Sequence, residues 1–237
     1  MGIWNTKFRN PALIAGVRKA VGYRADTIEA VGVGVPGPVD AAHGRIGEPV
    51  THVPALAGRP LGPELRERLR LPVFVDNDVN ALALGEWMFG AGKGSHSLVV
   101  LAVGTGIGAG IVIGGRVVRG VAGFGGELGH VPVKFDGPRC FCGGRGCVSV
   151  YASGRGIADA ARARVAGNPH AALVRAAADD PQGITAPLVF RAAAEGDVVA
   201  ASIVDEACQA MGAMLGIIVN GLNPKVIVIT GGVAQSL

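Results

Sequence analysis

The segment SLVVLAVGTGIGAGIVIGGRVVRG constrains the fold of this chain more than any other. It alternates apolar runs of strand length with glycine-rich turns, and its Gly-Gly pair is typical of a β-hairpin. We expect strands over Leu98–Val103, Ala109–Ile113 and Arg116–Arg119, with a glycine loop between the first two. The three strands would form an antiparallel meander, which argues against a helical bundle.

Further strands and helices are predicted on both sides of the meander. A strand over Ile28–Val35 ends at a Pro-Gly-Pro turn, and LPVFVDND is a second short strand. Val226–Thr230 is predicted to be a buried strand of the parallel type that runs into Gly231 and Gly232. Helices are expected over Pro11–Arg24, Leu61–Leu69, Gly154–Ala166, Ala186–Glu195 and Val198–Leu222, and from Asn77 or Asp78 to Gly90 or Gly92. This order of elements predicts an α/β fold.

The composition is that of a folded protein. Hydrophobic residues make up 49% of the 237 residues and charged residues 17%, which excludes a disordered chain. The net charge of +4 comes from basic residues without long runs, and the group Lys7, Arg9, Arg18, Lys19 and Arg24 is interpreted as a solvated helix face. We therefore expect no nucleic-acid partner. Because we find no signal peptide and no apolar stretch of about 18 residues, we expect a cytoplasmic protein without a membrane segment.

Three of the four cysteines lie close together, in the stretch CFCGGRGC. With the histidine upstream they give the spacing His130-x9-Cys140-x-Cys142-x4-Cys147. Clustered cysteines in a reducing compartment indicate a metal before a disulfide, and a Cys3His set is a closed zinc site without a position for water. The alternative is a group of ordinary buried cysteines and a core histidine, as expected for Cys208 alone in its Ala-rich helix. We predict a structural zinc ion rather than a catalytic one.

The turn VGTGIGAG carries Gly104, Thr105, Gly106, Gly108 and Gly110 between two predicted strands. Backbone N–H groups without side chains can surround phosphate oxygens, and the threonine hydroxyl adds a donor. No Gly-Lys-Ser/Thr follows, so this is not a Walker motif. A strand rather than a helix comes next, so it is not a dinucleotide fingerprint either. A phosphate loop and a merely tight hairpin both stay open at this point.

Asp76, Asn77 and Asp78 stand at the end of a strand and the start of a helix. Asp and Asn favour helix N-termini because they accept hydrogen bonds from free N–H groups and complement the helix dipole. An acid at such a junction beside a cleft could also act as general base, with the neighbouring Asn binding a polyol hydroxyl. From these residues alone, capping and catalysis are equally supported.

The stretch GFGGELGH places Glu127 three residues before His130. If one ring nitrogen of His130 binds zinc, the other is a fixed hydrogen-bond donor. A ligand hydroxyl could then contact both side chains. The metal would thus position a sugar-binding edge without taking part in the reaction.

Taken in order, these motifs resemble the ROK family, named for its repressors, open reading frames and sugar kinases. The resemblance rests on VGVGVPGPVD, DNDVNALALGE, VGTGIGAG, AGFGGELGHVPV, CFCGGRGC and LNPKVIVITGGVA, and it runs from about Ile28 to the last residue. It implies a two-lobed α/β fold of the actin/hexokinase (ribonuclease H-like) type, with sugar and ATP meeting between the lobes. Residues 1–77 would be the remaining part of the N-terminal lobe, and residues 78–237 the C-terminal lobe with the nucleotide loop and the zinc knuckle.

The resemblance also implies an ATP-dependent, glucokinase-like hexose kinase. Asp78 would be the general base that deprotonates the sugar hydroxyl attacking the γ-phosphate of ATP, which is bound with Mg²⁺. The same motifs imply sugar binding by Asn77, Asp78, Glu127 and His130, ATP contacts by Gly104, Thr105, Gly106, Gly108, Gly231 and Gly232, and a structural zinc ion on His130, Cys140, Cys142 and Cys147. Family members are commonly dimers or tetramers, so a homodimer or a higher homo-oligomer is expected.

The sequence departs from the family pattern in three places. The Asp-x-Gly-Gly-Thr phosphate loop does not occur, and neither do the helix and strand that usually follow ITGGVA, so we expect a chain truncated at both ends. After the last zinc cysteine, Ser149 stands where the family usually has a sugar-binding Glu. The functional alternatives are a hexose kinase by lineage, a non-catalytic sugar-sensing protein of the repressor branch, and a pseudokinase that acts by binding.

Overall fold

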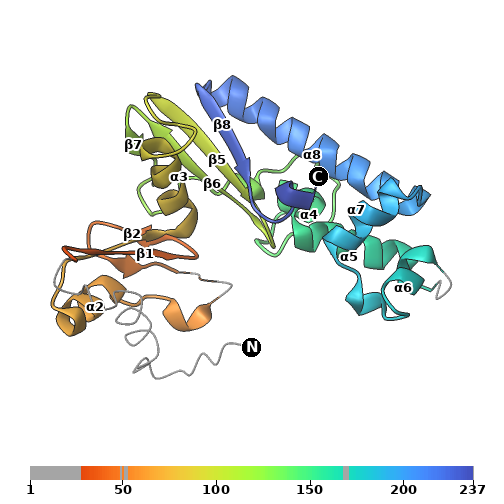
Figure 1. Ribbon diagram of the computed structural model, residues 1–237, viewed down its shortest axis with the longest axis horizontal. Helices are drawn as coiled ribbons and strands as arrows, with labels where there is room; N and C mark the ends of the chain where they lie inside the picture. Colours follow the sequence, from red (N-terminus) through yellow and green to blue (C-terminus); the bar gives the residue numbers. More distant parts are fainter. Residues whose placement is uncertain (1–27, 49, 51–52, 168–170, 237) are drawn as a thin grey trace. The chain divides into compact units, whose positions relative to one another are not determined.

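The structure is a computed structural model that describes residues 28–48, 50, 53–167 and 171–236 (Figure 1). The helix predicted over Pro11–Arg24 lies outside these residues. The described residues form two compact units. Unit 1 comprises the residues up to Ala81 together with Arg119–Gly125, and unit 2 comprises Leu82–Val118 and the residues from Gly126 onward. The lobe boundary between residues 77 and 78 stays a prediction.

Unit 1 is built on a β-α-β arrangement. β1 (Val31–Val35) pairs in parallel with β4 (Val73–Asn77), and α2 (Leu61–Leu69) precedes β4 in the chain. The α2 prediction is confirmed at both ends, whereas the strand predicted from Ile28 begins at Val31. The other elements are a hairpin of β2 (Val39–Asp40) with β3 (Arg45–Ile46), and the turn η2 (Pro54–Leu56). Side chains from all of them form one core: Val35, Val39, Ile46, Val50, Leu56, Leu61, Leu65, Val73 and Val75.

A four-stranded sheet in the order β7-β6-β5-β8 forms the centre of unit 2. β5 (Ser97–Val103), β6 (Ile107–Ile113) and β7 (Arg116–Val117) are the predicted antiparallel meander. β8 (Val226–Thr230) pairs with β5 in parallel, as predicted. The prediction that β8 is buried is wrong, because among the described residues it is an edge strand and most of its side chains are half-buried.

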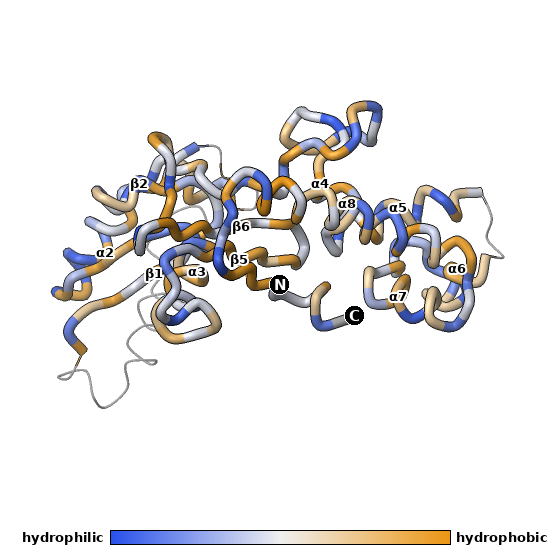
Figure 2. The backbone as a smooth tube through the Cα atoms, turned by 90° about the horizontal axis from the view of Figure 1, so that it is seen from above, coloured by the Kyte–Doolittle hydropathy of each residue, from blue (hydrophilic) through white to orange (hydrophobic). Residues whose placement is uncertain are grey.

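Side chains of β5 pack on both faces of the sheet, which explains why every residue of this strand after Ser97 is apolar. Figure 2 shows the hydrophobic colour of this strand. Val99 and Leu101 turn to the face where the core includes α4, α5, α7 and α8. Leu98 and Val100 turn to the other face, where they meet Ala83 of α3 (Asp78–Met88). A strand with helices on both sides loses the alternation of polar and apolar residues.

The helices of unit 2 are mostly those expected from the sequence. α5 (Gly154–Val165), α7 (Ala186–Ala194) and α8 (Val198–Leu222) confirm three predictions. α4 (Val148–Ala152) and α6 (Ala172–Ala176) are missed, because helices of 5 residues are too short to show a helical period. Short 3₁₀ turns complete the unit: η3 (Leu128–His130), η4 (Pro181–Gly183) and η5 (Ala234–Ser236).

Helix α8 is long and apolar enough, by length and composition, to cross a membrane, which corrects the sequence-based statement that no such stretch exists. Its buried residues recur every three or four positions, as in a helix packed along one side. They are Ala200, Ile203, Ala207, Ala210, Met214 and Ile218, and most of them belong to the core of unit 2. The exposed side of α8 carries Asp205 and Glu206. The buried stripe accounts for only part of the apolar character of α8, because Val198, Ile217 and Val219 are exposed.

Candidate functional site

The four predicted metal ligands lie together in unit 2. Nδ1 of His130 lies 3.5 Å from Sγ of Cys140, and Sγ of Cys142 lies 3.7 Å from Sγ of Cys147. One ligand atom from each residue lies within 4.8 Å of the others. In a tetrahedral zinc site with Zn–S bonds of about 2.3 Å, neighbouring sulfurs are roughly 3.8 Å apart. The observed separations therefore fit a tetrahedral ion of this size.

The backbone of the cysteine loop brings these ligands together. The N–H of Cys140 donates to the carbonyl oxygen of Gly144 at 2.9 Å, and the N–H of Gly143 donates back to that of Cys140 at 3.0 Å. Gly143 and Gly146 have φ angles of +92° and +63°, which side chains of L-residues rarely tolerate. A side chain at Gly146 would also collide with the carbonyl oxygen of Lys134. The glycines are thus required for the tight fold of the loop.

The thiols of the cluster differ in their proton affinity. Burial raises the pKa of Cys147 to about 12, and the neighbouring thiols of Cys142 and Cys140 add to the rise. Burial alone would raise the pKa of Cys142 as well. Hydrogen bonds with the Gly144 backbone and with the other two thiols outweigh burial, so the pKa of Cys142 is lowered overall. Metal binding requires thiolates. Cys147 must therefore lose a proton when an ion enters.

Cys208 takes no part in the cluster. It lies exposed on α8, so the expectation that it is an ordinary buried cysteine is wrong. Its position falls on the side of α8 that faces away from the buried stripe, which the Ala-rich composition of the helix did not reveal.

The second ring nitrogen of His130 faces Glu127. Nε2 lies 3.9 Å from Oε2 of Glu127, whose side chain is 43% exposed. Phe141 packs edge-on against the imidazole, with ring centroids 4.9 Å apart. The imidazole is therefore oriented from several sides, and one of its nitrogens points to an exposed carboxylate.

Ser149, in α4, lies against the turn that carries His130. Its side chain is buried, and its Oγ has no hydrogen-bond partner among the described residues. A Cβ added at Gly129 of η3 would lie 2.7 Å from this Oγ. The residue that replaces the family's usual Glu is thus a buried hydroxyl in contact with η3.

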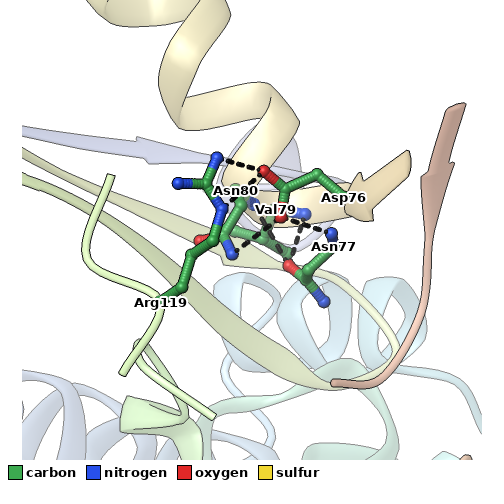
Figure 3. Close-up of polar contacts among 5 residues, drawn as sticks. All are labelled: Asp76, Asn77, Val79, Asn80 and Arg119. Atoms are coloured by element: carbon green, nitrogen blue, oxygen red, sulfur yellow. Dashed lines mark hydrogen bonds and ion pairs between the residues drawn. The ribbon is translucent and has the colours of Figure 1, made fainter. Parts of the chain in front are cut away.

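Asn77, the last residue of β4, belongs to unit 1 and caps α3 (Figure 3). Its Oδ1 accepts hydrogen bonds from the N–H groups of Val79 at 2.9 Å and Asn80 at 3.1 Å. Its Nδ2 donates to the carbonyl oxygen of Gly37 at 3.1 Å. The capping interpretation is therefore right for Asn77. One hydrogen of the amide nitrogen is not used by this bond.

Asp76 and Asp78 have different surroundings. Oδ2 of Asp76 accepts hydrogen bonds from Nε of Arg119 at 2.9 Å and from Nη2 at 2.5 Å. Oδ1 accepts from the N–H of Asn77 at 2.8 Å and from Nδ2 of Asn80 at 3.3 Å. Asp78 is exposed and accepts a hydrogen bond from the N–H of Val79 at 3.0 Å. Asp76 is thus saturated with donors, and Asp78 is the exposed acid of the two.

A cavity of about 570 Å³ lies beside the glycine loop of unit 2. Gly104, Thr105 and Gly232 line it, so two of the predicted nucleotide segments meet there. Gly106 and Gly108 belong to the same loop and strand but do not line the cavity. The N–H of Gly154 donates to the carbonyl oxygen of Gly104 at 2.8 Å and joins the loop to the start of α5.

Helix α5 and the start of α7 with its N-cap residue add residues to this cavity that sequence reasoning missed, among them Arg155, Arg162 and Thr185. The guanidinium of Arg162 donates to Asp159 and to the carbonyl oxygens of Gln182 and Ile184. Arginines within a predicted helix look like part of a solvated face, so no local signal could have assigned Arg155 and Arg162 to a cavity.

Known proteins share this architecture. A model of the ROK family matches residues 6–236. The glucokinase of Thermotoga maritima is 38% identical over 206 residues, which are 87% of this chain and 64% of that protein. The chain thus spans less than two thirds of the length of that relative.

Two solved structures extend the likeness. The ROK family glucokinase from Streptomyces griseus, in complex with glucose and AMPPNP, gives a TM-score of 0.76 at 34% identity, covering 96% of this chain and 73% of that one. A ROK family transcriptional regulator, a homologue of the E. coli MLC protein, gives a TM-score of 0.79 at 32% identity, covering 95% and 56%. The predicted α/β fold of the actin/hexokinase type is therefore confirmed, and the chain belongs to the ROK family.

Proposed function

We propose that this chain is an ATP-dependent hexose kinase of the glucokinase type. The observation that carries the proposal is the cavity in unit 2, where the Gly104–Thr105 loop and Gly232 come together beside a sheet end. Glycine backbones leave N–H groups accessible to phosphate oxygens. The identity of 38% to a glucokinase supports the same reaction class. The substrate, the partners and the activity of the whole protein belong to this proposal.

Asp78 is the proposed general base. A kinase of this type needs a carboxylate that takes the proton of the sugar hydroxyl as it attacks the γ-phosphate. Asp78 is exposed, whereas Asp76 already accepts four hydrogen bonds. An acid with no remaining acceptor capacity is a poor base. This contrast favours Asp78 over its neighbour.

Asn77, Asp78, Glu127 and His130 are the proposed sugar ligands. The exposed carboxylate of Glu127 and Nε2 of His130 supply an acceptor and a nitrogen that can donate, 3.9 Å apart. A sugar hydroxyl that donates to Glu127 could accept from His130. Ser149 cannot supply the charge of a Glu, which would weaken hexose binding by roughly 10- to 100-fold relative to a Glu-bearing relative.

ATP with Mg²⁺ is the proposed phosphoryl donor. When bound, it supplies the γ-phosphoryl group, and the metal neutralises part of the phosphate charge. Gly104, Thr105, Gly106 and Gly108 are the proposed phosphate segment, and Gly104 and Thr105 are its residues that line the cavity. The N–H of Gly104 already donates to the carbonyl oxygen of Gly106 at 2.9 Å, so the N–H and the hydroxyl of Thr105 are the proposed donors to phosphate. Gly231 and Gly232 are proposed to border the nucleoside.

His130, Cys140, Cys142 and Cys147 are proposed to hold a structural zinc ion. The fit of their separations to a tetrahedral ion and the closed Cys3His donor set support zinc. With no ligand position left for water, the ion would hold the loop and the imidazole and would take no part in phosphoryl transfer.

An ATP-coupled phosphorylation assay on a panel of hexoses tests the proposal. We expect the zinc-loaded chain to form a sugar phosphate, and Asp78→Asn to lower kcat by about 10²–10⁴-fold. Absence of turnover with every hexose, in a folded and zinc-loaded protein, contradicts the kinase proposal.

A sugar-binding protein without kinase activity is the second candidate. It is favoured by the TM-score of 0.79 to a ROK family transcriptional regulator and by Ser149 in place of the usual Glu. Hexose binding by calorimetry together with no ATP turnover would support it over the kinase. A cytoplasmic location and a homo-oligomeric state stay predictions for either function.

A further inference from the structure

Residues Arg119–Gly125 form a small loop that belongs to unit 1, although the chain before and after it belongs to unit 2. We call it the Arg119 loop. The N–H of Gly125 donates to the carbonyl oxygen of Arg119 at 2.8 Å and closes the loop on itself. Gly123 packs against the backbone of Val39, where an added Cβ would lie 2.8 Å from the carbonyl oxygen. The loop is therefore fixed to unit 1 by its backbone at one end.

The side chain of Arg119 ties the other end of the loop to the end of β4 (Figure 3). Its Nε and Nη2 both donate to Oδ2 of Asp76, at 2.9 and 2.5 Å. The side chains are 35% and 18% exposed, so the pair is partly shielded from water. Both donors meet the same oxygen, so the guanidinium holds Oδ2 of Asp76 and leaves Oδ1 to other donors.

The fixed carboxylate in turn orients the first turn of α3. Oδ1 of Asp76 accepts from the N–H of Asn77 and from Nδ2 of Asn80. The Asn80 side chain is 2% exposed, and its Oδ1 has no hydrogen-bond partner among the described residues. Asp76 therefore determines how this buried amide lies. The backbone N–H of Asn80 also donates a hydrogen bond to Oδ1 of Asn77, so Asp76, Asn77 and Asn80 form one hydrogen-bond network.

Asp78 stands between Asn77 and Asn80 in the chain, two residues that these hydrogen bonds hold in place. We infer that Arg119 is a positioning residue for Asp78, acting through Asp76 and the two asparagines. The inference rests on the proposed function, in which Asp78 is the general base. A misplacement of about 1 Å in such a group can cost around 10²-fold in rate.

Amide hydrogen exchange tests the structural part without requiring activity. In the full chain, Arg119→Ala should speed the exchange of the Val79, Asn80 and Gly125 amides by roughly tenfold, because their partners lose their fixed position. Arg119→Lys should give a smaller change. The matched control is Arg116→Ala, an exposed arginine of β7, which should leave these amides unchanged. The amides of β5 and β6 should keep their protection in every variant.

Steady-state kinetics test the positioning role. Arg119→Ala should lower kcat by about 10- to 100-fold with a change in hexose KM of less than about threefold, since the inferred role of Arg119 is to position the base and not to bind the sugar. Guanidinium ion added at millimolar concentration should restore part of kcat in Arg119→Ala but not in Asp78→Asn. A role in stability alone would give neither the kcat effect in a folded variant nor the rescue.

Asp76→Asn keeps the shape of the side chain and removes its charge. This variant replaces Arg119→Ala in both experiments if Arg119→Ala fails to fold. Unchanged exchange at Val79 and Asn80 in the folded variants overturns the inference, and so does an unchanged kcat. If the parent chain phosphorylates no hexose, the kinase proposal fails first. The exchange experiment then still decides whether Arg119 orders the start of α3.

Discussion

Nε2 of His130 lies 3.9 Å from Oε2 of Glu127, while Nδ1 of the same ring lies 3.5 Å from Sγ of Cys140. A single imidazole therefore joins the cysteine cluster to an exposed acid. Since a metal ligand is held at a fixed distance and angle by its ion, the ion would also fix the nitrogen that faces Glu127. Loss of the metal should consequently affect both the stability of the loop and the binding of a hexose.

Cys142→Ser is expected to lose the metal. The purified parent chain should contain close to one zinc ion per chain, and the variant close to none, because a hydroxyl replaces one of four ligands. The free energy of unfolding should fall by several kcal/mol, since the binding energy of a structural ion is folding energy. Elemental analysis and thermal unfolding measure the two effects. The control is Cys208→Ser, at an exposed cysteine outside the cluster, which should keep its zinc and stay within about 0.5 kcal/mol. Equal zinc content in both variants would contradict the ligand assignment.

Zinc loading is expected to release protons at neutral pH. The pKa of Cys147 in the metal-free chain is raised to about 12 by burial and the neighbouring thiols, so this group is a thiol at pH 7.5. It must become a thiolate on loading, and zinc affinity should therefore fall as the pH falls. Calorimetric titration of zinc at pH 7.5, in two buffers with different ionisation enthalpies, gives the proton number. We expect one or more protons per zinc ion. A heat of binding that does not depend on the buffer would show that no proton is released.

Two serines of α4 and its C-terminal end should respond to alanine in opposite ways. Oγ of Ser149 has no hydrogen-bond partner among the described residues, so Ser149→Ala should leave stability unchanged or raise it by up to about 1 kcal/mol. Oγ of Ser153 donates to the carbonyl oxygen of Ser149 at 2.6 Å and accepts from the N–H of Gly156 at 3.0 Å, capping α5. Ser153→Ala should cost about 1–2 kcal/mol. Urea unfolding of the two variants measures the difference, and the reverse order would contradict the assignment.

Substitutions at the two adjacent glycines after β8 should have different effects, one on nucleotide affinity and the other on stability. Gly232 lines the cavity, and an added Cβ there meets nothing within 4 Å, so a side chain can begin at this position without a clash, and Gly232→Leu is chosen to occupy the cavity. We expect its affinity for a fluorescent ATP analogue to fall at least about tenfold, with little change in the midpoint of thermal unfolding.

Gly231→Ala is the comparison for this experiment. Gly231 has a φ of +106°, and its side chain would collide with the carbonyl oxygen of Val103. This variant should lose about 1–3 kcal/mol of stability. Full nucleotide affinity in Gly232→Leu would show that the cavity does not bind the nucleotide.

Local patterns predicted most of the fold, because strands, turns and long helices each leave a signal within a few residues. The glycine-rich turns predict the meander, and the spacing of His130, Cys140, Cys142 and Cys147 predicts that these four side chains lie together. The pairing of Asp76 with Arg119 cannot be predicted in this way, since the two residues are 43 positions apart and the sequence around each one does not indicate its partner. Likewise, α5 contributes Arg155 to the cavity through tertiary packing alone. What the sequence left undetermined is the set of contacts between distant segments.

One of those distant contacts also affects how the chain folds. Val99 of β5 pairs with Ile227 of β8, so the central strand of unit 2 finds its parallel neighbour more than a hundred residues later. At a synthesis rate of about 5–20 residues per second, Ile227 is added roughly 6–25 s after Val99. During this time the edge of β5 that pairs with β8 has no partner strand. An apolar strand with a free edge is a template for intermolecular pairing. Slow refolding and aggregation at high protein concentration should therefore accompany this topology, and chaperones that shield nascent strands should raise the yield.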